Sequence, residues 1–391
     1  MPADPAPRFL GWRSLAAVYA PAALFSTSQG AVLPVLPLTA RDLGASVAAS
    51  AFLVALLGIG QVAGALPAGA MVARVGERRA MLFSALVSGA ALTGAVLAPD
   101  ETVLAACVLA LGLAAAIWSL ARQSFLTAAA PPHLRARALS TLGGVGRIGT
   151  FVGPFLGAAG SAVWGVRGSY VVAGVAVVLA AAVVLTLPDP EVAEHHPGPA
   201  PTLREVFRSH AHVLATLGVS ALAVQAVRQS RQTVLPLWCE HLGLDATTTS
   251  LVAGVSGAVD MLLFYPAGSV MDRVGRAAVG VPSMLVLAVG HVLLPFSHTA
   301  WTVALVGVVM GFGNGMGAGL VMTLGADVAP PGGRAVFLGA WRLVTDTGAA
   351  SGPLLVGALA GAGSLVVATG GVAVLAVAAA GGLFRFVPRR A

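Results

Sequence analysis

Long stretches of the chain repeat at a constant offset of 199 residues, and the repeat needs no gap. Residues 67–76 (PAGAMVARVG) return as residues 266–275 (PAGSVMDRVG), and Gly153-Pro154 returns as Gly352-Pro353. The chain therefore consists of two homologous halves, and its fold must be built twice. A duplication of this length in an apolar chain is typical of a membrane transporter assembled from repeats.

Composition excludes a soluble protein. Apolar residues make up 57% of the chain and charged residues 9%, whereas a soluble domain carries roughly 25% charged residues. The net charge of +7 and the pI near 10.8 could suggest a nucleic-acid partner. The arginines are dispersed among loops and form no basic patch with interleaved aromatic residues, so we expect no nucleic acid and instead a lipid bilayer as the surroundings.

Twelve apolar runs are long enough to cross a membrane, which takes about 20 residues each. We number them as helices 1 to 12: 14–38, 46–71, 79–98, 102–126, 138–163, 167–187, 211–237, 247–270, 276–296, 301–326, 336–360 and 363–384. The sequence therefore predicts an all-α integral membrane fold of two pseudo-symmetric six-helix bundles. The expected domains are residues 1–187 and 211–391, joined by a linker at 188–210. Internal prolines such as Pro34, Pro154 and Pro353 predict kinks in helices 1, 5 and 11.

Arginine placement predicts the orientation. Fifteen arginines, from Arg8 to Arg390, fall in alternate loops and tails, and two, Arg41 and Arg167, fall in the opposite loops. Because cytoplasmic loops carry the excess of positive charge, we expect both termini in the cytoplasm. The absence of Lys beside abundant Ala, Gly, Val and Arg indicates a high-GC bacterial genome, and hence the inner (plasma) membrane of a bacterium.

The turn Gly268-x-x-x-Asp272-Arg273-x-Gly275-Arg276 follows helix 8, and the chain resembles the major facilitator superfamily in this turn and in its two six-helix halves. The resemblance implies cytoplasmic gate loops made by these residues and by their counterparts in the first half: Gly69, Arg74, Gly76 and Arg78. Ala73 stands where the family has an Asp that clamps the gate. The gate charge is therefore expected to rest on Asp272, in contact with helix 5.

Helix 5 carries a second pattern, formed by Gly149, Gly153, Pro154 and Gly157. It is similar to a signature of drug and proton antiporters in the same family, which implies export. Helix 4 has Leu109 where those antiporters have an intramembrane Arg, so their coupling step cannot be copied onto this chain.

Seven ionisable residues fall within the predicted spans, where each costs roughly 2.5–3.5 kcal/mol on insertion scales and so requires a reason. They are Arg122, Arg147, Arg228, Arg231, Arg342, Asp260 and Asp346. The sequence supports two interpretations of Asp260 equally: a proton carrier, or a permanent ionic partner of an Arg such as Arg147. Asp346 follows Arg342 by four residues on one helix face, which favours an ion pair over a role with protons.

Helix 7 carries a polar stripe formed by Gln225, Arg228, Gln229 and Gln232, with Arg231 beside it. Helices 1, 4, 7 and 10 line the central cavity in the family, so the resemblance implies that this stripe contacts substrate together with Gln29 and Asn314. The alternative is hydrogen bonding between helices inside the bundle.

The sequence holds no nucleotide-binding loop, metal motif or Ser-His-Asp arrangement, so we expect no enzyme, cofactor or metal. The leading hypothesis is a monomeric secondary transporter that exports a small organic molecule or drug in exchange for protons by alternating access. The alternative is an uptake symporter or facilitator for a polar or anionic metabolite, which the surplus of buried Arg would suit better than a lipophilic cation. A membrane enzyme or sensor is disfavoured because no cluster of His, Asp and Glu lies near one interface.

Overall fold

The computed structural model describes residues 12–129, 135–187, 205, 208–330 and 334–387. Within these ranges a few side chains, including those of Ala73 and Asp272, lie outside the description, as does most of the expected linker. The described residues form helices and turns and contain no strand.

The N-terminal half holds seven helices: α1 (Trp12–Val32), α2 (Leu36–Asp42), α3 (Val47–Val75), α4 (Glu77–Leu97), α5 (Glu101–Ala129), α6 (Arg135–Trp164) and α7 (Val166–Leu185). The C-terminal half holds α9 (Ala211–Val213), the π-helical turn η3 (Leu214–Gly218), α10 (Val219–His241), α11 (Ala246–Val274), α12 (Arg276–Leu293), the 3-10 turn η4 (Leu294–Phe296), α13 (Ala300–Met316), α14 (Leu320–Val328), α15 (Arg334–Ala362) and α16 (Leu365–Phe386).

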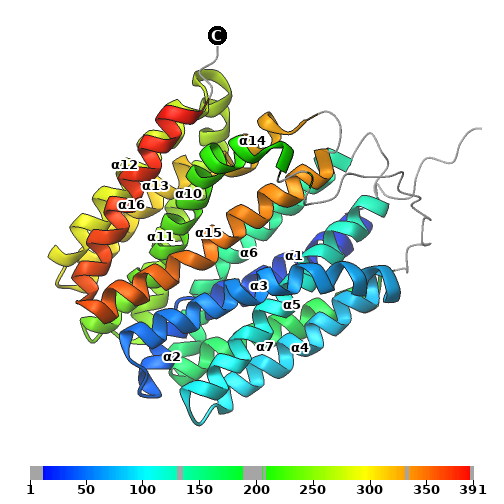
Figure 1. The fold of residues 1–391 in the computed structure, drawn as a ribbon. Coiled ribbons are helices and arrows are strands. Elements are labelled where there is room, and N and C mark those ends of the chain that lie inside the picture. Colours follow the sequence, from blue (N-terminus) through cyan, green and yellow to red (C-terminus); the bar gives the residue numbers. More distant parts are fainter. Residues whose placement is uncertain (1–11, 130–134, 188–204, 206–207, 331–333, 388–391) are drawn as a thin grey trace, which may run out of the picture.

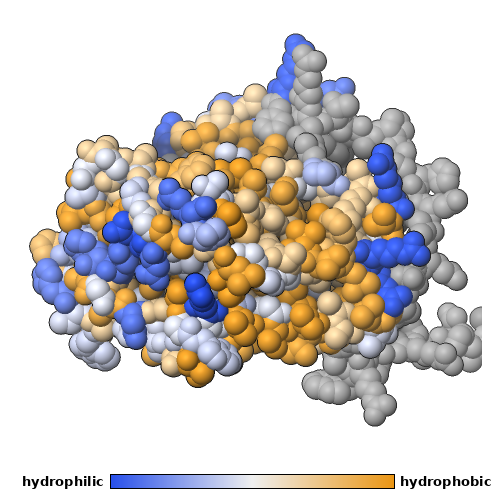
Figure 2. Space-filling view, turned by 90° about the horizontal axis from the view of Figure 1, so that it is seen from below, coloured by the Kyte–Doolittle hydropathy of each residue, from blue (hydrophilic) through white to orange (hydrophobic). Residues whose placement is uncertain are grey.

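Eleven spans in the described part of the chain are long and apolar enough to cross a membrane. The twelfth predicted span is α6, which has 30 residues and packs against α1, α7 and α11, but is less apolar. Apolar side chains cover much of the molecular surface, and hydrophilic residues gather toward two opposite ends (Figure 2). The predicted all-α membrane fold of two six-helix bundles is therefore confirmed.

Each half has its own apolar core, and the halves meet where α3 packs on α15 and α6 packs on α11. In Figure 1 the blue-to-green helices of the first half lie beside the green-to-red helices of the second, with α15 running between them. This arrangement leaves the surface between the halves available for a central site.

Close helix contacts recur at the repeat offset. A Cβ added to Gly149 of α6 would clash with the carbonyl oxygen of Ala23 in α1, and one added to its counterpart Gly348 would clash with that of Leu222 in α10. In the same way, a Cβ added to Gly112 of α5 would clash with a carbonyl oxygen of α3, and one added to its counterpart Gly311 of α13 would clash with a carbonyl oxygen of α11. Equivalent glycines thus let equivalent helices approach in both halves, because a side chain there would keep the backbones apart.

The structure corrects the predicted outline of two helices. Helix 1 is not continuous over 14–38 but stops at Val32 and resumes at Leu36, because Pro34 has no N–H to continue the ladder. Helix 10 is not continuous over 301–326 but breaks at residues 317–319, where Gly319 has φ +80°. Helices 5 and 11 run unbroken through Pro154 and Pro353 as α6 and α15.

The two ends of the molecule differ in charge. We call the end that carries Arg74, Arg78, Arg79, Arg273 and Arg276 the Arg-rich end, and the opposite end the Arg-poor end.

The halves approach closely on the Arg-poor side. There the guanidinium Nε of Arg41, in α2, lies 3.1 Å from the carboxylate Oε1 of Glu240, in α10. A Cβ on Gly58 of α3 would lie 3.0 Å from the backbone of Ala350 in α15, and one on Gly254 of α11 would lie 2.8 Å from the Phe155 ring of α6. These contacts join the two halves at this end.

Candidate functional site

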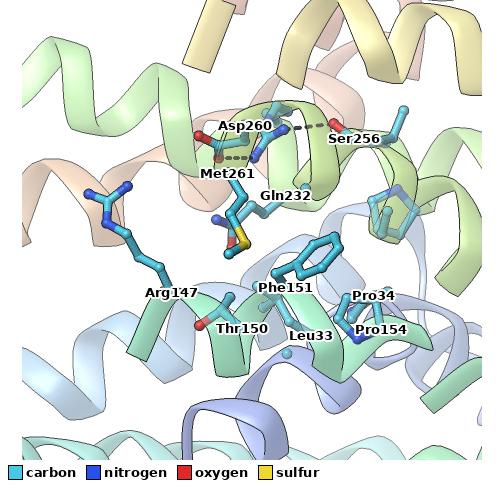
Figure 3. Close-up of a pocket in the computed structure, with 16 residues that line it drawn as sticks. Leu33, Pro34, Arg147, Thr150, Phe151, Pro154, Gln232, Ser256, Asp260 and Met261 are labelled. Carbon is cyan, nitrogen blue, oxygen red and sulfur yellow. Dashed lines mark hydrogen bonds and ion pairs between the residues drawn. The ribbon is translucent and has the colours of Figure 1, made fainter. Parts of the chain in front are cut away.

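A cavity of about 190 Å³ lies between the two halves, near the middle of the helices. The break in helix 1 and the central part of α6 form one wall, and α10 and α11 form the other. The lining residues are Gly30, Leu33, Pro34, Arg147, Thr150, Phe151, Pro154, Arg231, Gln232, Leu235, Pro236, Ala253, Ser256, Gly257, Asp260 and Met261. Figure 3 shows Asp260 and Ser256 on one side and Arg147, Thr150 and Phe151 on the other.

An ionic chain anchors the α10–α11 wall. The Nη2 of Arg231 lies 3.4 Å from Oδ2 of Asp260, and Nη1 of Arg231 donates to the Ser256 hydroxyl at 2.7 Å. Ser256 in turn donates to the carbonyl of Gly307 in α13 at 2.6 Å. The Arg231 and Asp260 side chains keep 8% and 20% of their surface exposed. Arg231 is therefore fixed at one amino group, while its ion pair at the other is longer than the usual 2.7–2.9 Å.

A second layer lies behind this wall. Arg228 donates from Nε to Oδ1 of Asn314 at 2.7 Å, and Asn314 donates from Nδ2 to Oδ2 of Asp260. Arg228 also reaches the carbonyls of Asn314 and Gly317, at 3.4 and 3.3 Å. The break in helix 10 exposes carbonyls at the end of α13, and a cation is the favoured partner for such a helix end. Arg228 therefore supports Asn314, which in turn holds Asp260.

Asp260 has one satisfied oxygen and one unsatisfied oxygen. Its Oδ2 receives both Arg231 and Asn314, whereas its Oδ1 is buried without a hydrogen-bond partner among the described residues. The Nε of Arg231 is also buried and unpartnered. Unsatisfied buried polar atoms are costly, so this wall is a place where a proton or a ligand would improve the bonding.

The residues predicted to contact substrate divide into three groups. Arg231 and Gln232 line the cavity, and Gln229 donates to Gln232 at 3.2 Å. Gln29 lines a smaller, mainly apolar pocket inside the N-terminal half. Gln225, Arg228 and Asn314 are not among the lining residues; Arg228 and Asn314 bond to each other, and Asn314 bonds to Asp260.

Sequence reasoning missed Ser256, Thr150, Phe151 and Met261 as lining residues. A signal for Ser256 was available, since it precedes Asp260 by four residues and so shares its helix face.

The polar wall has no equivalent in the first half. At the repeat offset, Arg231 corresponds to Val32, Ser256 to Leu57, and Asp260 to Gln61. In addition, Arg228 corresponds to Gln29 and Asn314 to Ala115. The N-terminal half instead contributes Arg147, whose counterpart is Asp346. One half of the cavity therefore carries the acid and its network, and the other carries an opposing cation and apolar groups.

Asp346 lies away from this cluster. It forms the ion pair with Arg342 expected from their spacing, at 3.3 Å, and the two side chains are 42% and 57% exposed. Neither lines the cavity.

The predicted gate loops are tight glycine turns at the Arg-rich end. Gly76 and Gly275 join α3 to α4 and α11 to α12, with φ +83° and +97°, which favours glycine at both positions. Arg78 donates to the carbonyl of Leu185, at the end of α7, at 2.6 Å. Arg276 pairs with Asp327 of α14 at 2.9 Å.

The remaining predicted gate residues add few described contacts. Arg74 and Arg273 are exposed, and a Cβ on Gly268 would meet nothing within 4 Å, while one on Gly69 would meet only Leu120. The predicted contact of Asp272 with helix 5 concerns a side chain outside the described set.

The three glycines of the helix 5 pattern form a packing surface. Gly149, Gly153 and Gly157 all lie against α1, and a Cβ on Gly153 would lie 2.6 Å from the carbonyl oxygen of Thr27. Pro154 lines the cavity. The pattern therefore joins α6 to the broken helix 1 and lies next to the site.

Comparison with known proteins agrees with this fold. The family model described as Major Facilitator Superfamily matches residues 18–229 and 217–391. No curated protein matches the chain.

Three solved structures illustrate the likeness. The nucleoside transporter NupG has a TM-score of 0.76 at 14% identity, over 95% of this chain and 99% of that one. A bacterial homologue of the human lysosomal transporter Spinster, in an inward-facing and unoccupied conformation, has a TM-score of 0.78 at 14% identity, over 95% of both chains. A D-xylose-proton symporter has a TM-score of 0.71 at 15% identity, over 97% and 99%.

Proposed function

The chain belongs to the major facilitator superfamily of secondary transporters, and on that premise we propose that it couples movement of a small molecule to movement of protons. The cavity between the halves is the substrate site, and Asp260 is the group that binds the proton. The observation that carries this proposal is the half-satisfied carboxylate of Asp260 at the cavity wall.

Two features of its bonding single out Asp260. Its Oδ1 is buried at the cavity wall without a hydrogen-bond partner among the described residues, whereas its Oδ2 is held by Arg231 and Asn314. A change at Arg231 alone would therefore alter the bonding of this carboxylate. Asp346 lacks these features, because it lies outside the cavity lining, is more exposed and pairs with an Arg on the same helix.

We further propose that the Arg-rich end faces the cytoplasm of a bacterial cell, with the protein acting as a monomer in the plasma membrane. The excess of positive charge at that end supports this orientation. The contacts between the halves at the Arg-poor end then close the cavity to the outside. Rocking of the halves about the cavity would open one end while closing the other.

Two directions of coupling have support. Export by proton antiport is supported by the pattern formed by Gly149, Gly153, Pro154 and Gly157, which is similar to that of drug and proton antiporters. Uptake by symport is supported by the likeness to a D-xylose-proton symporter, which is a likeness of fold.

The test uses purified full-length protein in proteoliposomes containing a pH-sensitive dye. The parent, Asp260→Asn and Asp346→Asn would each be given a panel of organic anions, neutral compounds and lipophilic cations. We expect at least one compound to move protons through the parent and through Asp346→Asn. Asp260→Asn should lose this proton movement while labelled substrate still equilibrates. Undiminished substrate-driven proton movement in Asp260→Asn would refute the assignment.

A further inference from the structure

The cavity has an excess of positive charge. Among the described residues that line it, Arg147 and Arg231 are cationic and Asp260 is the one acid. Arg228 adds a third guanidinium behind the wall, and the partners described for it are the neutral groups of Asn314 and Gly317. In a region of low dielectric, this surplus attracts an anion and repels a cation far more strongly than it would in water.

The two cations that line the cavity belong to different halves. Figure 3 shows Arg147 of α6 on the opposite side of the cavity from Asp260, whose partner Arg231 lies on the same wall. A ligand carboxylate placed between the walls would contact both halves at once. Such a ligand would draw the halves together around the site, as alternating access requires.

The bonding of Arg231 allows it to exchange the carboxylate of Asp260 for that of a ligand. Its Nη1 is held by Ser256, and among the described residues its Nη2 makes only the 3.4 Å contact with Asp260 and its Nε has no partner. A carboxylate that approached Nε and Nη2 together would make the two-pronged pairing that guanidinium groups favour. Asp260 would then lose its ionic partner.

We propose, resting on the function proposed above, that the substrate is a small organic anion whose carboxylate takes Arg231 from Asp260, so that Asp260 binds a proton and both move in the same direction. The charge in the cavity balances. One negative charge enters with the substrate, one proton neutralises Asp260, and the cavity returns to its original net charge. The protonated carboxyl group retains Asn314 as a partner.

The cavity also limits the body of this anion. Its volume of about 190 Å³ lies below the roughly 300–1,000 Å³ typical of drug-sized ligands. Leu33, Phe151 and Met261 supply apolar walls beside the charged end. A compact carboxylate with an apolar body fits this combination better than a bulky drug.

The test measures binding and proton exchange together, in detergent solution with little buffer. Three probes of similar size differ in charge: benzoate, benzamide and benzylammonium. The panel is extended to other compact carboxylates with their amides and amines. Thermal stabilisation reports binding, because a ligand that binds the folded state raises the melting temperature, and a pH indicator reports protons taken up or released.

We expect carboxylates to bind and to cause proton uptake, and the matched amides and amines to bind at least tenfold more weakly. Asp260→Asn should bind carboxylates without proton uptake. Arg231→Gln and Arg147→Gln should each weaken carboxylate binding at least tenfold. If the buried Arg231 variant fails to fold, Arg147→Gln alone tests the role of the two cations. Arg342→Gln, which lies outside the cavity lining, is the matched control and should behave as the parent does.

Amines that bind with proton release would overturn the inference and leave proton-coupled transport through Asp260 intact. Failure of every carboxylate to bind the parent would also overturn it. Carboxylate binding with no proton exchange in the parent would contradict both the inference and the proposed function.

Discussion

Gly149 lies in α6 where that helix packs tightly against α1. The carbonyl oxygen of Ala23 and the Cβ of Ser26 occupy the space that a side chain at this position would need. Because helix backbones cannot move apart locally without disturbing the cavity wall, this contact links packing to the site. Gly348 makes the equivalent contact in α15, so the same packing device serves both halves.

Gly149→Ala should therefore destabilise the protein by about 1–3 kcal/mol, the usual cost of overpacking. Gly143→Ala on the same helix is the control, since a Cβ there meets nothing within 4 Å, and Ala favours the helix by roughly 0.5–1 kcal/mol. Thermal unfolding in detergent would compare the two. Equal melting temperatures for both variants would show that the contact with α1 does not constrain α6.

At the scale of elements, two repeat-related caps begin α3 and α11. The Ser46 hydroxyl accepts from the Ala49 N–H at 3.1 Å, and the Asp245 carboxylate accepts from the Thr248 N–H at 2.8 Å. Hydrogen bonds from the Thr248 side chain and backbone lower the pKa of Asp245 below its usual value. Only one of these two caps therefore depends on pH.

Asp245→Ala and Ser46→Ala should each cost about 1 kcal/mol at pH 7. The Asp245 contribution should be complete above its unfolded pKa, near 4, and should be lost as the pH falls through its lower folded pKa. The difference in melting temperature between Asp245→Ala and the parent should therefore be smaller at pH 3 than at pH 7, whereas the difference for Ser46→Ala should stay the same. A pH-independent difference for Asp245→Ala would contradict this account.

The sequence located every long helix but not the breaks within two of them. Internal Pro predicted kinks at Pro34, Pro154 and Pro353; Pro34 interrupts its helix, whereas α6 and α15 continue through the other two. Neighbouring helices decide whether a freed carbonyl is satisfied, and one sequence does not show those neighbours. The break at Gly319 is similar, because alternate glycines across 311–319 left several positions able to adopt a left-handed backbone.

At the scale of the whole molecule, the offset of 199 residues predicted the two bundles, and periodicity predicted that α10 carries polar groups. Periodicity could not show which polar side chains of α10 reach the cavity. Arg228 turns away because the break in helix 10 presents carbonyls to it, and Arg231 turns toward Asp260. Both outcomes depend on tertiary contacts between helices that are distant in sequence.

The Arg41–Glu240 pair should hold the Arg-poor end closed. It is partly exposed, so its contribution is about 1 kcal/mol at most, which corresponds to roughly a fivefold change in population. The distance between the ends of the halves can be measured with spin labels at Leu43→Cys and Leu242→Cys, after the native cysteines have been replaced. In Glu240→Gln, the distance distribution between these labels should contain an additional, longer component. Reversing both charges, Arg41→Glu with Glu240→Arg, should restore the short distance. An unchanged distance distribution in Glu240→Gln would exclude this role.

Arg41 and Glu240 are also each other's counterparts in the repeat, exactly one offset of 199 residues apart. A contact between a position and its own copy lies on the pseudo-two-fold axis. Two identical halves would place identical residues there, and two identical residues cannot form a pair of opposite charges. The attraction that joins this end can therefore only have arisen after the two copies diverged, so the Arg41–Glu240 pair is younger than the duplication itself.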